Sequence, residues 1–447
     1  VIGGGASDGR LSAADVLVRI RPLAGSGGHA DDGTKDQKVL DSWDEKSVTI
    51  GTQYMFSKGE SKYTFPKHVF GPESTQQDVC DLAALDLVEP FTQRNGYNIL
   101  FLAYGQTGTG KTHTMFGTRE SLASKSAHPD WGIFPRVCDL SFQAMRAKTG
   151  VTFVIVASAI EFHMGECCDL LGDHAPVHCD FDTHEPSGHT CVELKDPGDL
   201  IPFLEKVNAN RTTRATKMND GSSRSHAALM LDLLQVDIAS NEYVKTTFTL
   251  VDLAGAERPG KASEGRMTGG MCADFLPQLV YLKQTGQMSD AKFKELIPVG
   301  AQGLVINHEL FALGTEVLKA TEQHRKGKPY KCPKTMLPPS IVFLGSILDG
   351  KALLRMCVCL SSAGQNGWET WFSLQYGTNL SKLRVPVHAQ KPQDFDKAFA
   401  AAERKAKTTL EAFEKSPMNQ YWYGRKMSAN GAAKHLERLQ VLQAALA

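Results

Sequence analysis

Hydrophobic and polar positions along the chain follow two periods that alternate from one segment to the next. Apolar runs that are continuous or alternate with polar residues predict buried strands; they occupy residues 15–23, 47–51, 63–70, 99–104, 151–162, 226–236, 246–253 and 353–360. Three- and four-residue spacing predicts helices at residues 76–91, 136–148, 199–209 and 306–321. The alternation predicts an α/β fold with a central, mostly parallel or mixed sheet and helices on both faces.

Three stretches depart from this pattern. Residues 165–197 are rich in His, Cys and Asp, but their spacing matches no standard zinc site, so we interpret them as a surface hairpin. Residues 269–303 are long and weakly patterned. Residues 391–447 leave the α/β pattern.

The last of these stretches predicts two helices. The first has an apolar stripe at Phe395, Phe399, Ala402, Ala406 and Phe413. Residues 417–431 are expected to interrupt the pattern, and a second helix is expected to carry Leu436, Leu439 and Leu446. The stripe is short for a coiled coil, so two alternatives remain, a dimer contact through this helix or a helix that packs back on the preceding domain.

Composition narrows the class of protein. The 447 residues are 42% hydrophobic and 22% charged, which excludes a wholly disordered chain. Lys+Arg and Asp+Glu are both 49, so we expect no general attraction to nucleic acid. No apolar stretch reaches about 18 residues, so we expect no membrane span. Ten cysteines and a glycine-rich start without a signal-peptide pattern favour a reduced, cytoplasmic setting.

A glycine-rich segment follows directly after the apolar run at residues 99–104. It reads Gly105-Gln106-Thr107-Gly108-Thr109-Gly110-Lys111-Thr112, which fits the GxxxxGK[ST] pattern of a phosphate-binding loop between a strand and a helix. The glycines let backbone N–H groups turn toward anionic oxygens, and the helix N-terminus adds partial positive charge. Lys111 is suited to the β and γ phosphates, and Thr112 is suited to Mg²⁺.

Two later segments carry residues suited to sensing a phosphate. The first reads Asn219-Asp-Gly-Ser222-Ser223-Arg224-Ser-His, whose hydroxyls and cation can hold a metal-bound water and a γ-phosphate. The second reads Asp252-Leu-Ala-Gly255-Ala-Glu257 and follows an apolar strand. Its Asp can hold Mg²⁺ through water, and its Gly lets a backbone N–H approach the phosphate closely. Taken alone, the first is more simply explained as a polar turn before a strand, and the second as a solvated strand end.

Together these segments closely resemble the kinesin motor family. The family's phosphate loop reads GQTxxGKT, its first switch NxxSSRSH and its second switch DLAGxE, and all three occur here in that order. Further matches are Arg19-Ile-Arg21-Pro22, Asn210-Arg211, Ile306-Asn307 and Ala312-Leu313-Gly314. The resemblance spans roughly residues 15–385 and implies the kinesin motor fold, a P-loop NTPase with about eight central strands.

The resemblance also implies the roles of the matched residues. Adenine is bordered by Arg19, Arg21 and Pro22. Gly105 to Thr112, with His113, contact ATP or ADP. Mg²⁺ is faced by Thr112, Ser223 and Asp252. The first switch contains Asn219, Ser222 and Ser223, and the second contains Asp252 and Gly255. Arg224 and Glu257 form an ion pair that closes when ATP is ready to hydrolyse.

Several positions depart from the family pattern. Cys80 stands where the family often has a Tyr that stacks on adenine. The span from Asp252 to Ile306 is about thirty residues longer than the family spacing. The family's track-binding PYRDSKLTRLL becomes Pro329-Tyr330-Lys-Cys-Pro333-Lys-Thr-Met-Leu-Pro338-Pro339, in which prolines require the expected helix to be shifted, broken or shortened. Lys326, Lys328, Lys331 and Lys334 still form a basic cluster there, either a rebuilt tubulin contact or a solvated loop.

The expected function is that of an ATPase motor domain on microtubules, with ATP/ADP and Mg²⁺ as ligands and a cytoskeletal location. A nucleotide-binding module with degenerate track binding and an ATP-driven remodeller of tubulin ends are the alternatives. The expected organisation is a flexible segment at 1–14, a motor domain at 15–383 with an insertion at 269–303, a neck-linker-like segment at 384–390 and a helical tail at 391–447.

Overall fold

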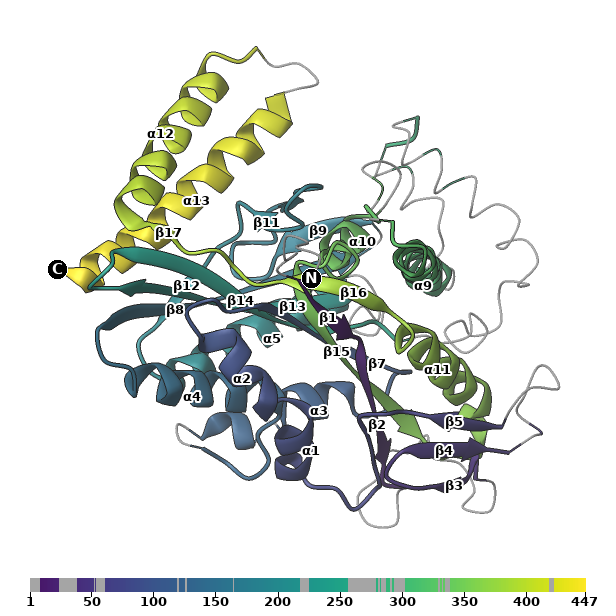
Figure 1. Ribbon diagram of the computed structural model, residues 1–447. Helices are drawn as coiled ribbons and strands as arrows, with labels where there is room; N and C mark the ends of the chain where they lie inside the picture. The colour runs from purple at the N-terminus through teal and green to yellow at the C-terminus, as the bar shows by residue number, and fades with distance from the viewer. Residues whose placement is uncertain are drawn as a thin grey trace, which may run out of the picture.

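A mixed β-sheet forms the centre of the molecule (Figure 1). The computed structural model describes residues 9–23, 38–51, 53, 61–118, 120–124, 127–163, 165–217, 225–255, 279, 282, 287–289, 292, 302–328, 330–331, 333, 338–417 and 422–447. The strand order is β12-β8-β13-β14-β7-β15-β2-β6, with β9 paired to β8 and β17 paired to β14. These strands are β2 (Asp15–Arg21), β6 (His68–Phe70), β7 (Asn98–Tyr104), β8 (Val151–His163), β9 (Glu166–Asp169), β12 (Val192–Leu194), β13 (His226–Asp237), β14 (Glu242–Asp252), β15 (Ala352–Ser361) and β17 (Gln393–Asp394).

Several neighbouring strands of this sheet run in the same direction. β14, β7, β15, β2 and β6 run parallel, whereas β8, β13 and β14 pair antiparallel. The carboxyl ends of the parallel strands therefore meet at one edge, which is where open α/β sheets bind ligands. The expected mixed sheet is confirmed.

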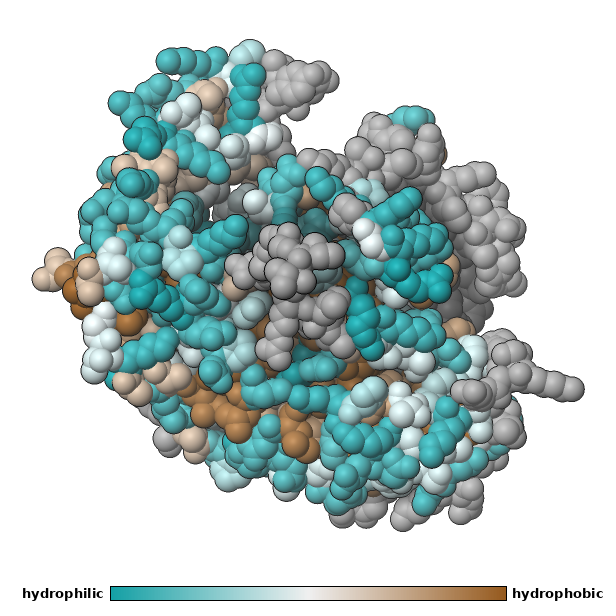
Figure 2. Space-filling model, in the orientation of Figure 1, coloured by the Kyte–Doolittle hydropathy of each residue, from teal (hydrophilic) through white to brown (hydrophobic). Residues whose placement is uncertain are grey.

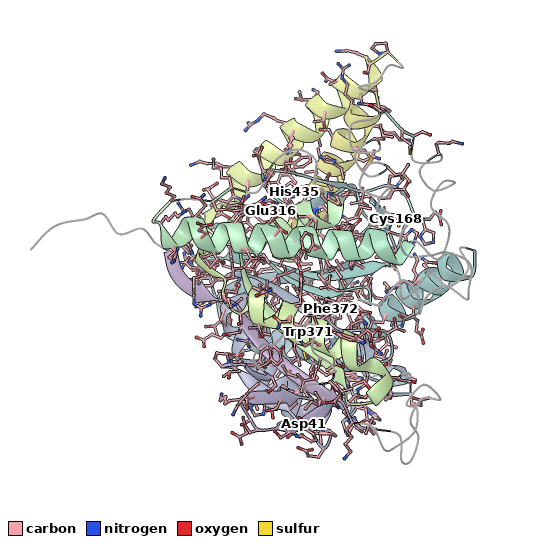
Figure 3. All side chains as sticks on the ribbon, turned by 90° about the vertical axis from the view of Figure 1, so that its right-hand side faces the viewer. Asp41, Cys168, Glu316, Trp371, Phe372 and His435 are labelled. Atoms are coloured by element: carbon pink, nitrogen blue, oxygen red, sulfur yellow. The ribbon has the colours of Figure 1, made fainter. Side chains whose placement is uncertain are left out.

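Helices cover both faces of the sheet. One face carries α1 (Gln76–Ala83), α2 (Leu85–Thr92), α3 (Lys111–Phe116), α4 (Ile133–Arg146) and α5 (Leu200–Lys217). The other carries α9 (Gln302–Arg325), α10 (Pro339–Leu344) and α11 (Gly367–Leu380). Seen from the side in Figure 3, α9 lies across the molecule at Glu316, with Trp371 and Phe372 of α11 beneath it. None of the described helices is long and apolar enough to cross a membrane.

Two predicted elements are split in the structure. The strand expected at 63–70 is β5 (Lys62–Thr64) and β6, which lie in different sheets, because Pro66 between them offers no N–H to a ladder. β5 belongs to a small sheet with β3 (Leu40–Trp43) and β4 (Ser47–Ile50). The helix expected at 76–91 is α1 and α2, which are separated at Ala84. Figure 2 shows a hydrophobic band in the region of α2, where Leu85 is exposed.

The segment at 165–197 contains antiparallel pairing, as a hairpin requires, but part of it is buried rather than on the surface. It contains β9, β12 and a two-stranded ladder of β10 (His178–Cys179) and β11 (Pro186–Ser187). His184 and His189 are buried, and the ring of His184 hydrogen-bonds to the Val342 carbonyl of α10 at 2.5 Å and to the Asp349 carboxylate at 2.9 Å. The segment is therefore a packed layer of the domain.

The first described strand pairs with the segment that follows α11. Residues 9–13, expected within a flexible segment, instead form β1 (Gly9–Ala13), which pairs antiparallel with β16 (Arg384–His388). The neck-linker-like segment therefore lies as a strand beside the core. The Gln390 N–H then donates to the Gly96 carbonyl at 2.7 Å, and β17 pairs with the start of β14.

A helical hairpin follows this linker. α12 (Phe395–Glu414) begins at Asp394, whose carboxylate accepts from the Lys397 N–H. α13 (Trp422–Leu446) returns along α12 to the sheet (Figure 1). The expected interruption at 417–431 is too long, because α13 already begins at Trp422. Phe395, Ala402, Leu439 and Leu442 pack on apolar residues of β8, β13 and β14, so the structure favours a tail packed on the core over a free coiled-coil seam.

Candidate nucleotide site

The glycine-rich loop lies between β7 and α3, as its pattern requires. β7 is buried along nearly its whole length because its side chains are apolar on both faces. Gly105 has φ 146°, and a Cβ there would lie 2.2 Å from the Cys359 carbonyl oxygen of β15, so no larger residue fits. Gly110 has φ 92° and starts α3, and a Cβ on it would meet nothing. The loop therefore forms an open turn of backbone amides at a helix N-terminus.

Lys111 and Thr112 occupy the first turn of α3. The Lys111 ammonium is buried and donates to the Gly105 and Gln106 carbonyls at 2.8 and 2.9 Å, which holds it across the loop. The Thr112 hydroxyl donates to Asp252 Oδ2 at 3.3 Å. Two residues 140 positions apart in the sequence thus meet because β14 lies next to β7 in the sheet.

Asp252 fits a site for Mg²⁺. It is buried at the end of β14, and its Oδ1 has no hydrogen-bond partner in the described part of the chain. A buried carboxylate oxygen beside a threonine hydroxyl and a phosphate loop matches the oxygen ligands and waters that Mg²⁺ prefers. The expected placement of Thr112 and Asp252 on one metal is therefore geometrically consistent.

Arg211 lies between two carboxylates, one of which is that of Asp252. Arg211 of α5 places Nη1 3.4 Å from Asp252 Oδ2 and Nε 3.9 Å from Glu161 Oε1. The Ser225 hydroxyl donates to Glu161 Oε1 at 2.6 Å. Arg211 thus links the helix before the first switch to the strand end of the second. All four residues are largely buried, so removal of one partner would leave an uncompensated polar group.

A chain of contacts connects this region to α9. The Ala254 N–H donates to His226 Nδ1 at 2.8 Å, so the proton of the neutral ring is on Nε2. Burial and then Arg211 lower the pKa of His226 to about 3, so the ring is neutral. Nε2 lies 3.8 Å from Glu309 Oε2 of α9, which accepts from the Ser340 hydroxyl of α10 at 2.6 Å.

The residues expected to border adenine are partly brought together. The Arg19 guanidinium donates to Gln76 Oε1 at 2.7 Å and to the Thr114 hydroxyl at 2.9 Å, and the Gln76 amide donates to the His113 carbonyl at 2.6 Å. Arg19 therefore ties the start of α1 to α3. Arg21 and Pro22 end and follow β2 at the same edge of the sheet. Cys80 is a buried residue of α1 and belongs to the apolar cluster on this face of the sheet. Burial raises the pKa of its thiol to about 11.

The remaining expected site residues lie outside the described residues. These are Asn219, Ser222, Ser223, Arg224 and Glu257. Gly255 is the last residue described before the gap that follows β14. The structure therefore brings together the phosphate loop, Asp252 and the residues around Arg19.

The sequence prediction missed Glu161 and gave Arg211 no role. Glu161 is a carboxylate in an otherwise apolar stretch of β8, and a charge on a strand that reads as fully buried is the signal that could have found it. The pairing of β13 with β8 places Ala227 opposite Glu161 and brings Ser225 within hydrogen-bond distance of it. Local sequence patterns do not reveal this pairing.

A comparison with protein families identifies the family of this chain. The family model described as the kinesin motor domain matches residues 19–271, which include the loop, Arg211 and Asp252. The chain belongs to the kinesin motor domain family. The kinesin motor fold is also found in a solved structure of a fast kinesin, with a TM-score of 0.60, 20% identity and coverage of 85% of this chain and 94% of that chain.

Several curated kinesins are similar to this chain. Human chromosome-associated kinesin KIF4A is 31% identical over 361 residues, which are 78% of this chain and 25% of that protein. Kinesin-like protein Klp61F of Drosophila melanogaster is 34% identical over 260 residues, 55% of this chain and 24% of that protein. Human kinesin-like protein KIF27 is 29% identical over 387 residues, 83% of this chain and 24% of that protein. The chain thus spans about a quarter of the length of these relatives.

Proposed function

We propose that this kinesin chain is an ATP-hydrolysing motor domain that acts on microtubules in the cytoskeleton and converts the presence of a γ-phosphate into a conformational change. The carrying observation is the meeting of Lys111, Thr112 and Asp252 at the carboxyl edge of β7 and β14. A lysine, a hydroxyl and a buried carboxylate around a backbone-amide turn are the groups that phosphoryl transfer needs.

In this proposal the chain acts by positioning and by charge. The loop amides from Gly105 to Gly110 and Lys111 hold the phosphates of ATP or ADP, and Arg19 with Arg21, Pro22 and His113 lies on the adenine side. Thr112, Ser223 and Asp252 hold Mg²⁺, which neutralises charge on the phosphates when bound. Ser222 with Asn219 and the Arg224–Glu257 pair orient the attacking water, and Gly255 offers its N–H to the γ-phosphate.

The link from the site to α9 gives this proposal a mechanical output. Ala254 precedes the proposed phosphate contact, and its N–H is held by His226, which faces Glu309 on α9. α9 exposes Phe311 and Leu318 on its outer side, where a filament surface could bind. A movement of the Ala254 backbone would thus reach the filament-facing helix through one imidazole.

A steady-state ATPase assay with and without microtubules tests the proposal. We expect basal turnover that rises severalfold or more when microtubules are added. Turnover without stimulation, together with intact nucleotide binding, would favour a nucleotide-binding module with degenerate track binding. Shortening of stabilised microtubules with ATP but without gliding would favour a remodeller of tubulin ends.

One observation favours the degenerate-track alternative. Among the residues of the track-binding motif that the structure describes, a helix begins only at Pro339, where the six-residue α10 starts; residues 329, 332 and 334–337 lie outside the description. Lys328 and Lys331 beside it are exposed, and Lys326 pairs with Glu322 at 2.7 Å. The charges of Lys328 and Lys331 remain available to an acidic surface, and Lys334 lies outside the described residues.

Neutralising Lys326, Lys328 and Lys331 to Gln is expected to weaken microtubule co-sedimentation by roughly tenfold at low salt, because exposed cations attract an acidic surface. Basal ATP turnover should be unchanged. The matched control replaces three exposed lysines, Lys405 and Lys407 of α12 and Lys415 directly after it, with Gln. Equal binding by the two variants would show that the track contact lies elsewhere.

Glu309→Gln is expected to lower microtubule-stimulated turnover by about fivefold and to leave basal turnover near its original value, because it removes the charge that faces His226 while keeping an acceptor for Ser340. The control is Glu316→Gln, which alters another buried carboxylate two turns along α9 that bonds to Tyr330 and Lys319. An equal loss in both variants would assign the effect to helix packing.

A further inference from the structure

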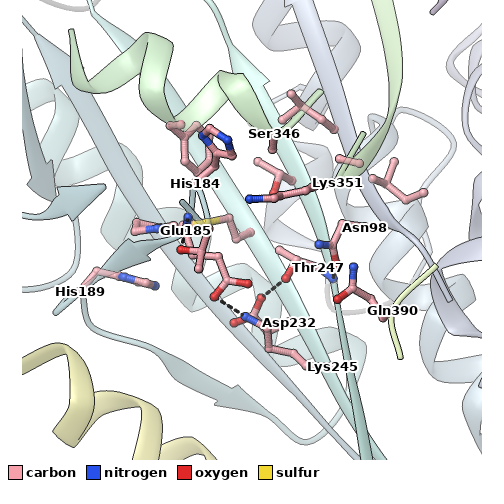
Figure 4. Close-up of a pocket in the computed structure, with 18 of the residues that line it drawn as sticks. Asn98, His184, Glu185, His189, Asp232, Lys245, Thr247, Ser346, Lys351 and Gln390 are labelled. Atoms are coloured by element: carbon pink, nitrogen blue, oxygen red, sulfur yellow. Dashed lines mark hydrogen bonds and ion pairs between the residues drawn. The ribbon is translucent and has the colours of Figure 1, made fainter. Parts of the chain in front are cut away.

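A cavity of about 340 Å³, lined by apolar surface and several charged side chains, lies on the sheet beside the C-terminal hairpin. Residues of β7, β13 and β14 line one side of it, and His184, Glu185, His189, Ser346, Lys351 and Gln390 line the other (Figure 4). Arg438 of α13 also belongs to the lining. The volume is at the lower end of the range for small-molecule sites. No residue of the phosphate loop lines it, so the cavity is distinct from the candidate nucleotide site.

Two ion pairs are built into this cavity. Asp232 Oδ2 accepts from the Arg438 guanidinium at 2.7 Å, and its Oδ1 accepts from the Thr247 hydroxyl at 2.7 Å. Lys245 Nζ lies 3.0 Å from Glu185 Oε2. Burial alone would raise the pKa of Asp232, but Lys245, Arg438 and Thr247 lower it to about 2. These four charges therefore offset one another.

Other polar groups of the lining have no such partner. Within the described residues, the Lys351 ammonium, the Gln390 amide and the hydroxyls of Ser346 and Thr249 make no hydrogen bond through their side chains. His189 is 2% exposed, and its Nδ1 is buried with no partner in the part of the chain that the structure describes. Buried polar atoms are rarely left unpaired, so His189 Nδ1 points to a ligand, and the half-buried side chains of Lys351, Gln390 and Ser346 line the same cavity.

The charges determine which ligand fits. Three cations, Lys245, Lys351 and Arg438, line the cavity with two carboxylates, Glu185 and Asp232, which leaves one positive charge in excess. Burial, and then Arg438, lower the pKa of His189 to about 3, so its ring is neutral and the excess charge belongs to Lys351. An ammonium that shares a cavity with amide and hydroxyl donors is suited to an oxyanion.

We propose that this cavity binds a small oxyanion, a carboxylate or a phosphate, with Lys351 as the charge that holds it and with Gln390, Ser346 and Thr249 as hydrogen-bond partners. Gln390 belongs to the segment after β16, and Arg438 belongs to α13, so the walls are complete only while both lie against the sheet. The bound anion would therefore favour the docked arrangement of linker and hairpin.

Calorimetric titration of the full chain with sodium phosphate and with disodium succinate tests the proposal, with sodium chloride at equal ionic strength and neutral succinamide as references. We expect saturable binding of either anion or both. Binding should survive Lys111→Ala, which removes the charge of the phosphate loop, and should weaken about tenfold or more in Lys351→Met. Lys328→Met, an exposed lysine outside the cavity, is the matched control and should bind as the original chain does.

The imidazole of His189 provides a second measurement, which is made on the original chain and uses a variant only to assign the resonance. A bound anion should raise the pKa of His189, followed by nitrogen NMR with the resonance assigned through His189→Gln. Absence of saturable binding below about 10 mM would overturn the proposal. So would an anion that is lost in Lys111→Ala but retained in Lys351→Met, or that saturates without shifting His189.

Discussion

Lys111→Ala is expected to reduce ATP turnover by about 10³-fold, since it removes the one full positive charge within the phosphate loop. The Lys111 ammonium lies across that loop and is held by two carbonyls of its own turn, so its position does not depend on a distant element. A discontinuous or coupled ATPase assay at saturating ATP measures the loss.

The matched control is Lys148→Ala. Lys148 follows α4, is half-buried and donates to the backbone carbonyl of Thr92, which precedes β7, whereas the loop follows the end of β7. Both variants lose comparable backbone contacts, so their unfolding midpoints should be similar, and only Lys111→Ala should lose turnover. Retained turnover in Lys111→Ala would mean that phosphate is transferred at another site.

The second large effect is on stability. Arg438→Met is expected to cost about 3 kcal/mol, because it leaves the buried Asp232 carboxylate with fewer compensating partners. Urea unfolding measures the free energy, and hydrogen exchange along α13 shows whether the hairpin opens before the core. The exchange should rise first in α13, because Arg438 is its charged contact with β13.

Lys434→Met provides the comparison within the same helix. Lys434 pairs with the exposed Glu437 at 2.9 Å, and such surface pairs contribute roughly 0–1 kcal/mol. The double variant Asp232→Leu with Arg438→Met should recover most of the stability, because a buried ion pair can be replaced by apolar residues at little cost. If Arg438→Met is no more harmful than Lys434→Met, the ionic contact does not hold the hairpin.

The sequence predicted those parts of the fold that are set by local pattern. The apolar runs at 99–104, 151–162 and 226–236 predicted central strands because strands buried on both faces leave a nearly continuous apolar run. The phosphate loop was predictable for the same reason, since its glycines and Lys111 act within eight consecutive residues. Boundaries were less accurate where a break such as Ala84 depends on how two helices pack.

Long-range partners could not be predicted from local pattern. Asp232 reads as one polar residue in an apolar strand, and only the return of α13 to the sheet reveals Arg438 as its partner. The pairing of β1 with β16 joins residues about 375 positions apart, which no periodicity encodes. Glu161 and Arg211 likewise acquire meaning only when β8, β13 and α5 are assembled.

The hairpin after β17 changes how a stroke of this motor would be transmitted. A flexible tether passes on tension but no direction, because its segments reorient freely. α12 instead extends 20 residues from the anchored β17, about 30 Å at 1.5 Å per residue, and α13 braces it against the sheet. The contacts of α13 with the sheet therefore fix the direction of α12. In the proposed motor domain, α12 would change direction only when these contacts of α13 are released as well as the linker.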